Sequence, residues 1–118
     1  MTKIIFNSEP PCIAVWGHAG KAAAGCDIVC AGVSALCFTL AEMLTATKGR
    51  KERFRPEIYQ DREQALLFIA SRPESDSRAD CLLIYETVCT GLEMLAEKYP
   101  DNVSFCRGIE KENESILK

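Results

Sequence analysis

The sequence predicts an α/β fold of the α+β type: a two-layer sandwich with two long helices on one face of a small, mostly antiparallel sheet. Two observations predict it. Short runs rich in β-branched and aromatic residues are separated by two long stretches whose apolar residues recur every three or four positions. The strand-like runs before each long stretch come in pairs with turn residues between them. The expected order is therefore β-β-α-β-β-α-β.

The first strand pair is expected at Thr2–Asn7 and Cys12–Gly17, as a hairpin around the turn sequence SEPP. The Gly- and Ala-rich segment HAGKAAAG, residues 18–25, has no apolar periodicity. Its alanines could form a helical turn, but a surface loop is the expected structure. Asp27 is a suitable N-cap for the first helix, which should end before Gly49.

The second half of the sequence is expected to repeat the order of two strands followed by a long helix, and then to add a last strand. Gly91 falls inside the second helix, where glycine costs about 1 kcal/mol relative to alanine, so we expect it to let the two helices approach closely. Residues 1–109 are expected to form one domain and residues 110–118 a flexible tail. The expected elements are strands at Arg53–Asp61 and Glu63–Ser71, a polar loop over Arg72–Asp80, a helix capped by Asp80 and stopped by Pro100, and a strand at Asn102–Ile109.

Charge and hydropathy exclude several function classes. The net charge is −3 and the isoelectric point about 5.2, which argues against nucleic acid as a direct partner. The only basic run, Lys48–Arg55, is expected to be a solvated helix end and loop. No segment is expected to span a membrane, and the N-terminus lacks the apolar core of a signal peptide. We therefore expect a cytoplasmic protein.

Seven cysteines are many for 118 residues, but without a secretion signal most should be free thiols. His18, Cys26 and Cys30 could supply three ligands of a zinc site, but the sequence has no close C-x2-C pair, which is the strong signal for zinc. We expect no metal and no cofactor. Five cysteines are expected to be small core residues, Cys37, Cys81 and Cys89 in helical runs and Cys12 and Cys106 in strand-like runs.

Cys30 and His18 are the candidate catalytic residues. With Asp27 as N-cap, Cys30 lies in the first helical turn, where the macrodipole and unpaired N–H groups favour a thiolate and could hold an oxyanion. Cys30 falls at the border of the apolar stripe, where substrate can reach it. His18 is the only histidine, and it can serve as the base for a nearby thiol. The chemistry of these two residues by itself leaves two simpler interpretations open. His18 could be a solvated surface residue, and Cys30 could only fill space in the packing of the helix.

The strings GHAG and GCDIVCAGVSAL closely resemble the signature of the ribosomal-processing cysteine protease family (Prp). The closing stretch AEKYPDNVSF is also similar to the family's last helix and strand. The resemblance covers nearly the whole chain. The matching residues are Gly17, His18, Ala19 and Gly20, followed by Gly25, Asp27, Ile28, Val29, Cys30, Ala31, Val33 and Ser34.

The resemblance implies a bacterial cytoplasmic endopeptidase that forms homodimers. Its substrate would be the N-terminal extension of ribosomal protein twenty-seven of the large subunit. Cys30 would be the nucleophile and His18 the base, with Asp27 and Ser34 as supporting residues. Gly17, Ala19, Gly20, Gly25 and Cys26 would belong to a loop that closes over an extended peptide.

The loop KAAAGC departs from the bulkier, more polar loop of many members, which puts substrate preference in doubt. Cys26 adds a second thiol near Cys30, with which it could form a disulfide under oxidation. Two alternatives remain: a ribosome-associated binding module without chemistry, and a thiol redox sensor that uses Cys26 and Cys30.

Overall fold

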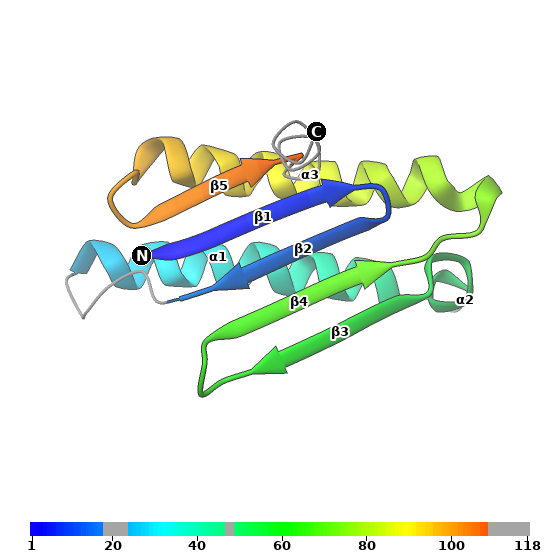
Figure 1. The fold of residues 1–118 in the computed structure, drawn as a ribbon, viewed down its shortest axis with the longest axis horizontal. Coiled ribbons are helices and arrows are strands. Elements are labelled where there is room, and N and C mark those ends of the chain that lie inside the picture. The colour runs from blue at the N-terminus through cyan, green and yellow to red at the C-terminus, as the bar shows by residue number, and fades with distance from the viewer. Residues whose placement is uncertain (18–23, 47–48, 109–118) are drawn as a thin grey trace, which may run out of the picture.

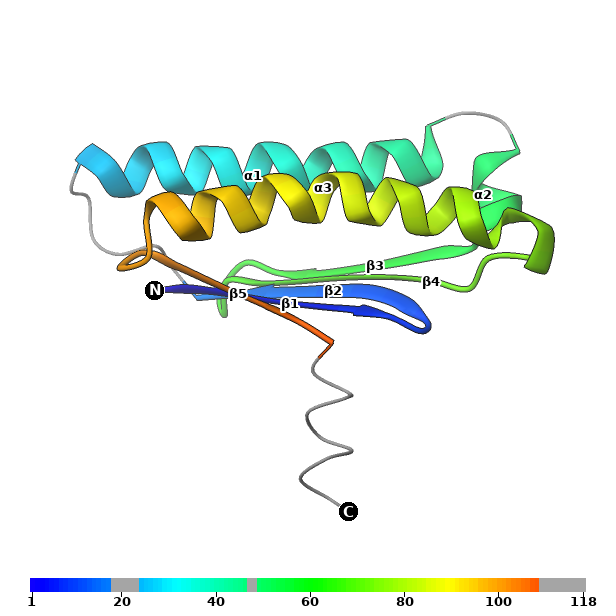
Figure 2. The same ribbon diagram turned by 90° about the horizontal axis from the view of Figure 1, so that it is seen from above.

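The computed structural model describes residues 1–17, 24–46 and 49–108, with only the backbone for residues 24–27. A five-stranded sheet forms one layer, and the two long helices lie side by side on one of its faces (Figures 1 and 2). The predicted fold class and its two-layer arrangement are confirmed. The predicted tail, residues 110–118, lies outside the described residues.

Two hairpins make up most of the sheet, whose strand order is β3-β4-β2-β1-β5. The hairpins join through β2 and β4, and β5 pairs with β1 in parallel, whereas all other neighbours are antiparallel. β3 and β5 are therefore the edge strands. The bounds are β1 Thr2–Ser8, β2 Pro11–Trp16, β3 Pro56–Asp61, β4 Leu66–Ser71 and β5 Val103–Arg107.

The helical layer consists mainly of α1 (Ala24–Thr45) and α3 (Arg78–Lys98). A short helix, α2 (Arg50–Phe54), and a single 3-10 turn, η1 (Ser75–Ser77), complete the connections. Each long helix buries one stripe at three- and four-residue spacing, as the sequence periodicity predicts. The stripe of α1 is Val29, Val33, Cys37, Leu40 and Leu44, and that of α3 is Cys81, Tyr85, Val88, Cys89 and Leu92.

The predicted role of Gly91 is confirmed by its position against α1. A Cβ atom at Gly91 would lie 3.0 Å from both methyl carbons of Leu36. In the opposite direction, a Cβ atom at Gly32 of α1 would lie 3.1 Å from Cδ1 of Leu95 on α3. Each glycine thus accommodates a leucine of the other helix.

The predicted start of α1 is wrong. The helix begins at Ala24, three residues before Asp27, so Asp27 lies inside the helix and is not its N-cap. Alanine has the highest helix propensity, which favours extension of the helix into the AAAG segment. Gly25 and Cys26, expected in the substrate loop, therefore belong to the first turn of α1.

The region around the second helix also differs from the prediction. Arg53 and Phe54, expected to begin a strand, instead end the short helix α2, and β3 begins at Pro56. α3 begins at Arg78, so Asp80 is not its N-cap. Asp80 accepts a hydrogen bond at 2.8 Å from Arg53 of α2, and Arg53 also donates to Ser77 Oγ at 2.9 Å. Arg53 thereby ties α2 to the start of α3, and Phe54 beside it is buried.

By length and composition alone, α1 is long and apolar enough to cross a membrane, which the sequence analysis did not anticipate. The window Ile28–Thr45 has a mean hydropathy of 1.8 over 18 residues. The same helix packs its buried stripe against the sheet, as the core helix of an α/β sandwich does. This feature is therefore weak evidence for a membrane segment.

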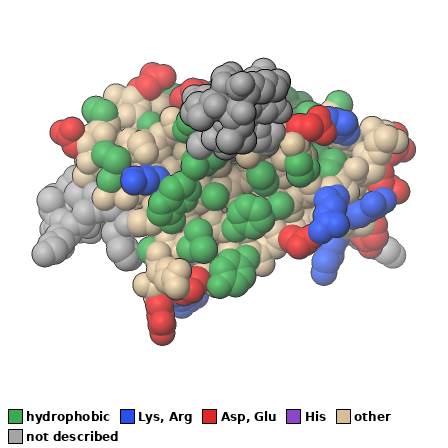
Figure 3. Space-filling view, viewed as in Figure 1, with side chains coloured by type: hydrophobic (Ala, Val, Ile, Leu, Met, Phe, Trp, Pro, Cys, Tyr) green, Lys and Arg blue, Asp and Glu red, His purple; other side chains and the backbone are tan. Residues whose placement is uncertain are grey.

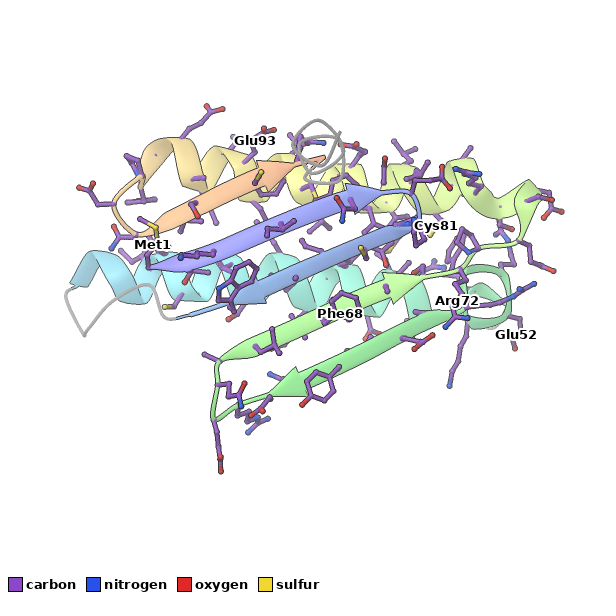
Figure 4. The ribbon with its side chains drawn as sticks, in the orientation of Figure 1. Met1, Glu52, Phe68, Arg72, Cys81 and Glu93 are labelled. Atoms are coloured by element: carbon purple, nitrogen blue, oxygen red, sulfur yellow. The ribbon has the colours of Figure 1, made fainter. Side chains whose placement is uncertain are left out.

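None of the described helices covers the face of the sheet opposite α1 and α3, called here the open face, and this face carries apolar side chains. Figure 3 shows hydrophobic side chains gathered over the strands on this face. Phe68, labelled in Figure 4, lies there beside Tyr59, its register partner on β3. Cys12 and Cys106 are half-buried, so the prediction that all five structural cysteines lie in the core holds only for Cys37, Cys81 and Cys89.

Candidate active site

A cavity of about 420 Å³ lies between α1, the end of β2 and the turn that joins β3 to β4. Cys30, Ser34 and Phe38 contribute from α1, at intervals of four residues that place them on one helix face. Gly17 contributes from the chain just after β2. Three segments far apart in the sequence therefore enclose one cavity, and two of them carry residues predicted for catalysis or substrate binding.

Among the residues whose side chains are described, two cysteines line this cavity, Cys30 and Cys37, and their surroundings differ. Cys37 is 1% exposed, and burial raises the pKa of its thiol to about 12, so it stays protonated at neutral pH. Cys30 is half-buried and is a free thiol. A nucleophile must be reached by substrate, so Cys30 is the cavity thiol suited to this role.

Gly17 fixes the chain at the point where it enters the segment that begins with His18. Its φ of +88° lies in the left-handed region, and a Cβ atom there would be only 2.5 Å from the backbone oxygen of Met1. Its N–H donates to the carbonyl oxygen of Ala65 in the β3–β4 turn, at 3.1 Å. Glycine at this position is thus required by backbone geometry.

The β3–β4 turn is the wall of the cavity that sequence reasoning missed. Asp61 Oδ1 accepts hydrogen bonds from the backbone N–H groups of Glu63 at 3.0 Å and Gln64 at 3.3 Å, which holds the turn. Asp61 and Arg62 both line the cavity. No motif marks them, because only the pairing of β4 with β2 brings this turn next to Gly17.

The remaining predicted site residues lie at the border of the described structure. His18, Ala19 and Gly20 are outside the described residues, and for Gly25, Cys26 and Asp27 only the helical backbone is described. Ser34 lines the cavity one turn after Cys30 and is exposed. The part of the chain that the structure describes contains no group of three potential metal ligands.

Because α1 begins at Ala24, Cys30 does not lie in the first helical turn, where the sequence analysis expected the macrodipole to favour its thiolate. Cys30 is the seventh residue of the helix, whereas the macrodipole acts mainly within the first turn. At this position the N–H of Cys30 bonds within the helix, so it is not available as an oxyanion donor. The described start of α1 therefore does not support the predicted activation of Cys30 by the helix N-terminus.

Comparison with protein families identifies this arrangement. The family model described as cysteine protease Prp matches residues 1–104. The chain belongs to this family. The match extends from β1 into β5 and includes every strand and helix that borders the cavity. A comparison with curated proteins finds no significant match.

Solved Prp structures share the fold. The ribosomal processing protease Prp from S. aureus, in complex with a covalently linked product peptide, has a TM-score of 0.70 and 25% sequence identity. The match covers 91% of this chain and 99% of that one, and the S. aureus complex with a substrate peptide gives the same values. SMU.848 from Streptococcus mutans is similar in fold, with a TM-score of 0.65, 24% identity and 90% of each chain covered.

Proposed function

We propose that this protein is a cysteine endopeptidase that removes the N-terminal extension of ribosomal protein twenty-seven of the large subunit. The observation that carries the proposal is the position of Cys30: a free, half-buried thiol in the wall of a cavity, within a family of cysteine proteases. S. aureus Prp, similar over nearly its whole length, holds a covalently linked product peptide. A cysteine nucleophile forms such a covalent link.

The proposed chemistry is acyl transfer by a dyad. His18 takes the proton of Cys30, and the thiolate attacks the carbonyl carbon of the scissile peptide bond. His18 then protonates the leaving amine, and water hydrolyses the thioester between Cys30 and the peptide. Gly17, which lines the cavity directly before His18 in the sequence, supports this pairing. Asp27 and Ser34 are proposed as supporting residues.

The test is cleavage of a peptide that spans the N-terminal extension, followed by mass spectrometry. We expect Cys30→Ala to lower the cleavage rate by roughly 10⁴-fold or more, and His18→Ala by roughly 10²-fold or more. Cys106→Ala removes a half-buried thiol on the open face of the sheet and should leave the rate unchanged. Cleavage that survives Cys30→Ala would contradict the mechanism. Peptide binding without cleavage by the unaltered protein would favour the non-catalytic binding module.

The same assay separates the protease from a redox sensor. In a redox sensor that forms a disulfide bond between Cys26 and Cys30, oxidation would change the activity measured in this assay. The variant Cys26→Ala would no longer show that change on oxidation. The protease is expected to remain active in Cys26→Ala under reducing conditions, because only Cys30 attacks the peptide.

We also propose that the protein is bacterial and cytoplasmic and works as a homodimer, as its family resemblance implies. Light scattering after size-exclusion chromatography would give twice the 13.1 kDa chain mass for a dimer. A mass of one chain at the concentration used for the cleavage assay would contradict it.

A further inference from the structure

The open face of the sheet is apolar at positions where water would normally meet polar side chains. Ile4, Ile13 and Ile69 are buried beneath the helices, so their neighbours along each strand point to the open face. The strand register arranges these outward residues in three rows across β3, β4, β2 and β1. The first row is Asp61, Leu66, Trp16 and Lys3, the second is Tyr59, Phe68, Ala14 and Ile5, and the third is Glu57, Ala70, Cys12 and Asn7.

The centre of these three rows is apolar, and charged or amide side chains stand only at the four corners, Asp61, Lys3, Glu57 and Asn7. A sheet with one solvated face typically alternates apolar and polar residues along each strand, so an apolar outward set indicates a face that is covered. Figure 3 shows the hydrophobic side chains gathered in the middle of this face. Phe68 is nevertheless 38% exposed and Tyr59 56% exposed in the single chain.

The apolar members of the three rows, called here the sheet patch, combine large and small side chains. Phe68 is paired directly with Ala14 on the neighbouring strand, and Ala70 lies two residues further along β4. An aromatic ring beside two methyl side chains gives the patch a raised part next to a low part. Such a surface can pack against a copy of itself, because a two-fold axis sets the raised part of each copy over the low part of the other.

One two-fold axis fits the register of the patch. It runs parallel to the strands, between two sheets packed face to face about 10 Å apart, and midway between β2 and β4. Rotation about this axis sets β4 opposite β2 of the second copy, and β3 opposite its β1. Phe68 then lies opposite Ala14 of the partner subunit, and Tyr59 opposite Ile5 of the partner subunit.

The same axis brings opposite charges together at the corners. It sets Asp61 opposite Lys3 of the partner subunit and Glu57 opposite Asn7 of the partner subunit, so no two like charges face each other. Complementary charges at the rim of an interface fix its register. We propose that the sheet patch is the interface of a dimer in which two copies of this chain pack sheet to sheet about this axis.

Trp16, the only tryptophan of the chain, lies in the first row and reports directly on burial of the sheet patch. The purified full chain is diluted while light scattering measures its mass, which should fall from twice 13.1 kDa to 13.1 kDa. Over the same concentration range, the fluorescence emission of Trp16 should shift to longer wavelength, because the indole ring becomes exposed to water. A dimer formed through α1 and α3 would leave the emission unchanged.

Two substitutions in the rows test the contacts, and one in the helical layer is the matched control. Phe68→Arg places a charge in the centre of the interface and should raise the dimer dissociation constant about a hundredfold or more. Lys3→Glu sets two carboxylates opposite each other and should raise that constant about tenfold. Lys3 is exposed, so this variant keeps its core even if Phe68→Arg fails the check of folding by circular dichroism. Leu83→Arg should change nothing, because Leu83 is 66% exposed on α3.

The interface belongs to the homodimer proposed above and rests on that proposal, but its test needs no cleavage. A dimer with the expected Trp16 shift in a protein that cleaves nothing would remove the protease and leave the interface. A dimer that Leu83→Arg dissociates, and that Lys3→Glu and Phe68→Arg do not, overturns the interface in favour of the helical layer. A monomer at every concentration also overturns it, and leaves the sheet patch to a different protein.

Discussion

At the scale of single residues, burial separates the cysteines into inert and accessible thiols. Burial raises the pKa of Cys81, and it raises the pKa values of Cys37 and Cys89 to about 12. The sequence predicts these three core positions correctly, because each lies in an apolar helical stripe. It also places Cys30 correctly at the border of its stripe. The half-burial of Cys12 and Cys106 could not be predicted, since it depends on which sheet face the helices cover.

The buried thiols predict how stability depends on pH. In the unfolded chain Cys37 and Cys89 ionise near their ordinary value of 9.0, whereas in the folded protein they remain protonated up to about pH 12. Above pH 9 the unfolded state therefore binds fewer protons, and the free energy of unfolding falls as pH rises. The expected loss by pH 10 is roughly 1 kcal/mol for each thiol. Urea unfolding at pH 8 and pH 10 should show a smaller decrease for Cys37→Ala/Cys89→Ala than for the unaltered protein. Equal decreases would contradict this prediction.

Gly17 and Gly49 offer a matched pair of glycine substitutions. Both have a positive φ, but a Cβ atom at Gly17 would strike the backbone of Met1, whereas nothing lies within 4 Å of one at Gly49. Gly49→Ala should cost roughly 1 kcal/mol for its backbone conformation alone. Gly17→Ala should cost roughly 1–3 kcal/mol more, since the backbone at the cavity must shift. Urea unfolding midpoints measure both, and equal losses would show that the contact with Met1 does not matter.

At the scale of secondary-structure elements, apolar periodicity predicted five strands and two long helices, apart from Arg53–Arg55, which precede β3. The capping rules, in contrast, misplaced the first residue of both long helices. Asp27 and Asp80 are good N-cap residues, yet both helices begin before them. Alanine propensity accounts for the early start of α1. Asp80 pairs instead with Arg53, 27 positions earlier in the chain, and a contact over that separation leaves no local pattern.

The packing of α1 on α3 predicts the effect of filling the space at Gly91. Gly91→Val places methyl groups against Leu36, whose methyl carbons are already 3.0 Å from a Cβ atom there. We expect a loss of roughly 1–3 kcal/mol from overpacking. Thr90→Val is the control, because Thr90 is already β-branched and its side chain is exposed, so its effect should stay within about 0.5 kcal/mol. Thermal unfolding of the two variants compares them directly, and equal Tm values would contradict close helix packing at this position.

At the scale of the whole molecule, the fold brings Cys30, Gly17 and the β3–β4 turn to one cavity. The motif around His18 and Cys30 indicated two of these three segments in advance. The third could not be predicted, because it reaches the cavity through the antiparallel pairing of β2 with β4 and carries no sequence signal of its own.

The central claim, that Cys30 is the nucleophile, is tested most directly by alkylation with iodoacetamide under reducing conditions. Peptide mapping would follow modification at each cysteine while cleavage of the ribosomal extension peptide is measured on the same samples. We predict that activity falls in proportion to modification of Cys30, while the buried Cys37 in the same cavity stays unmodified. Full activity with Cys30 completely alkylated, or loss of activity that follows Cys26 instead, would contradict the claim.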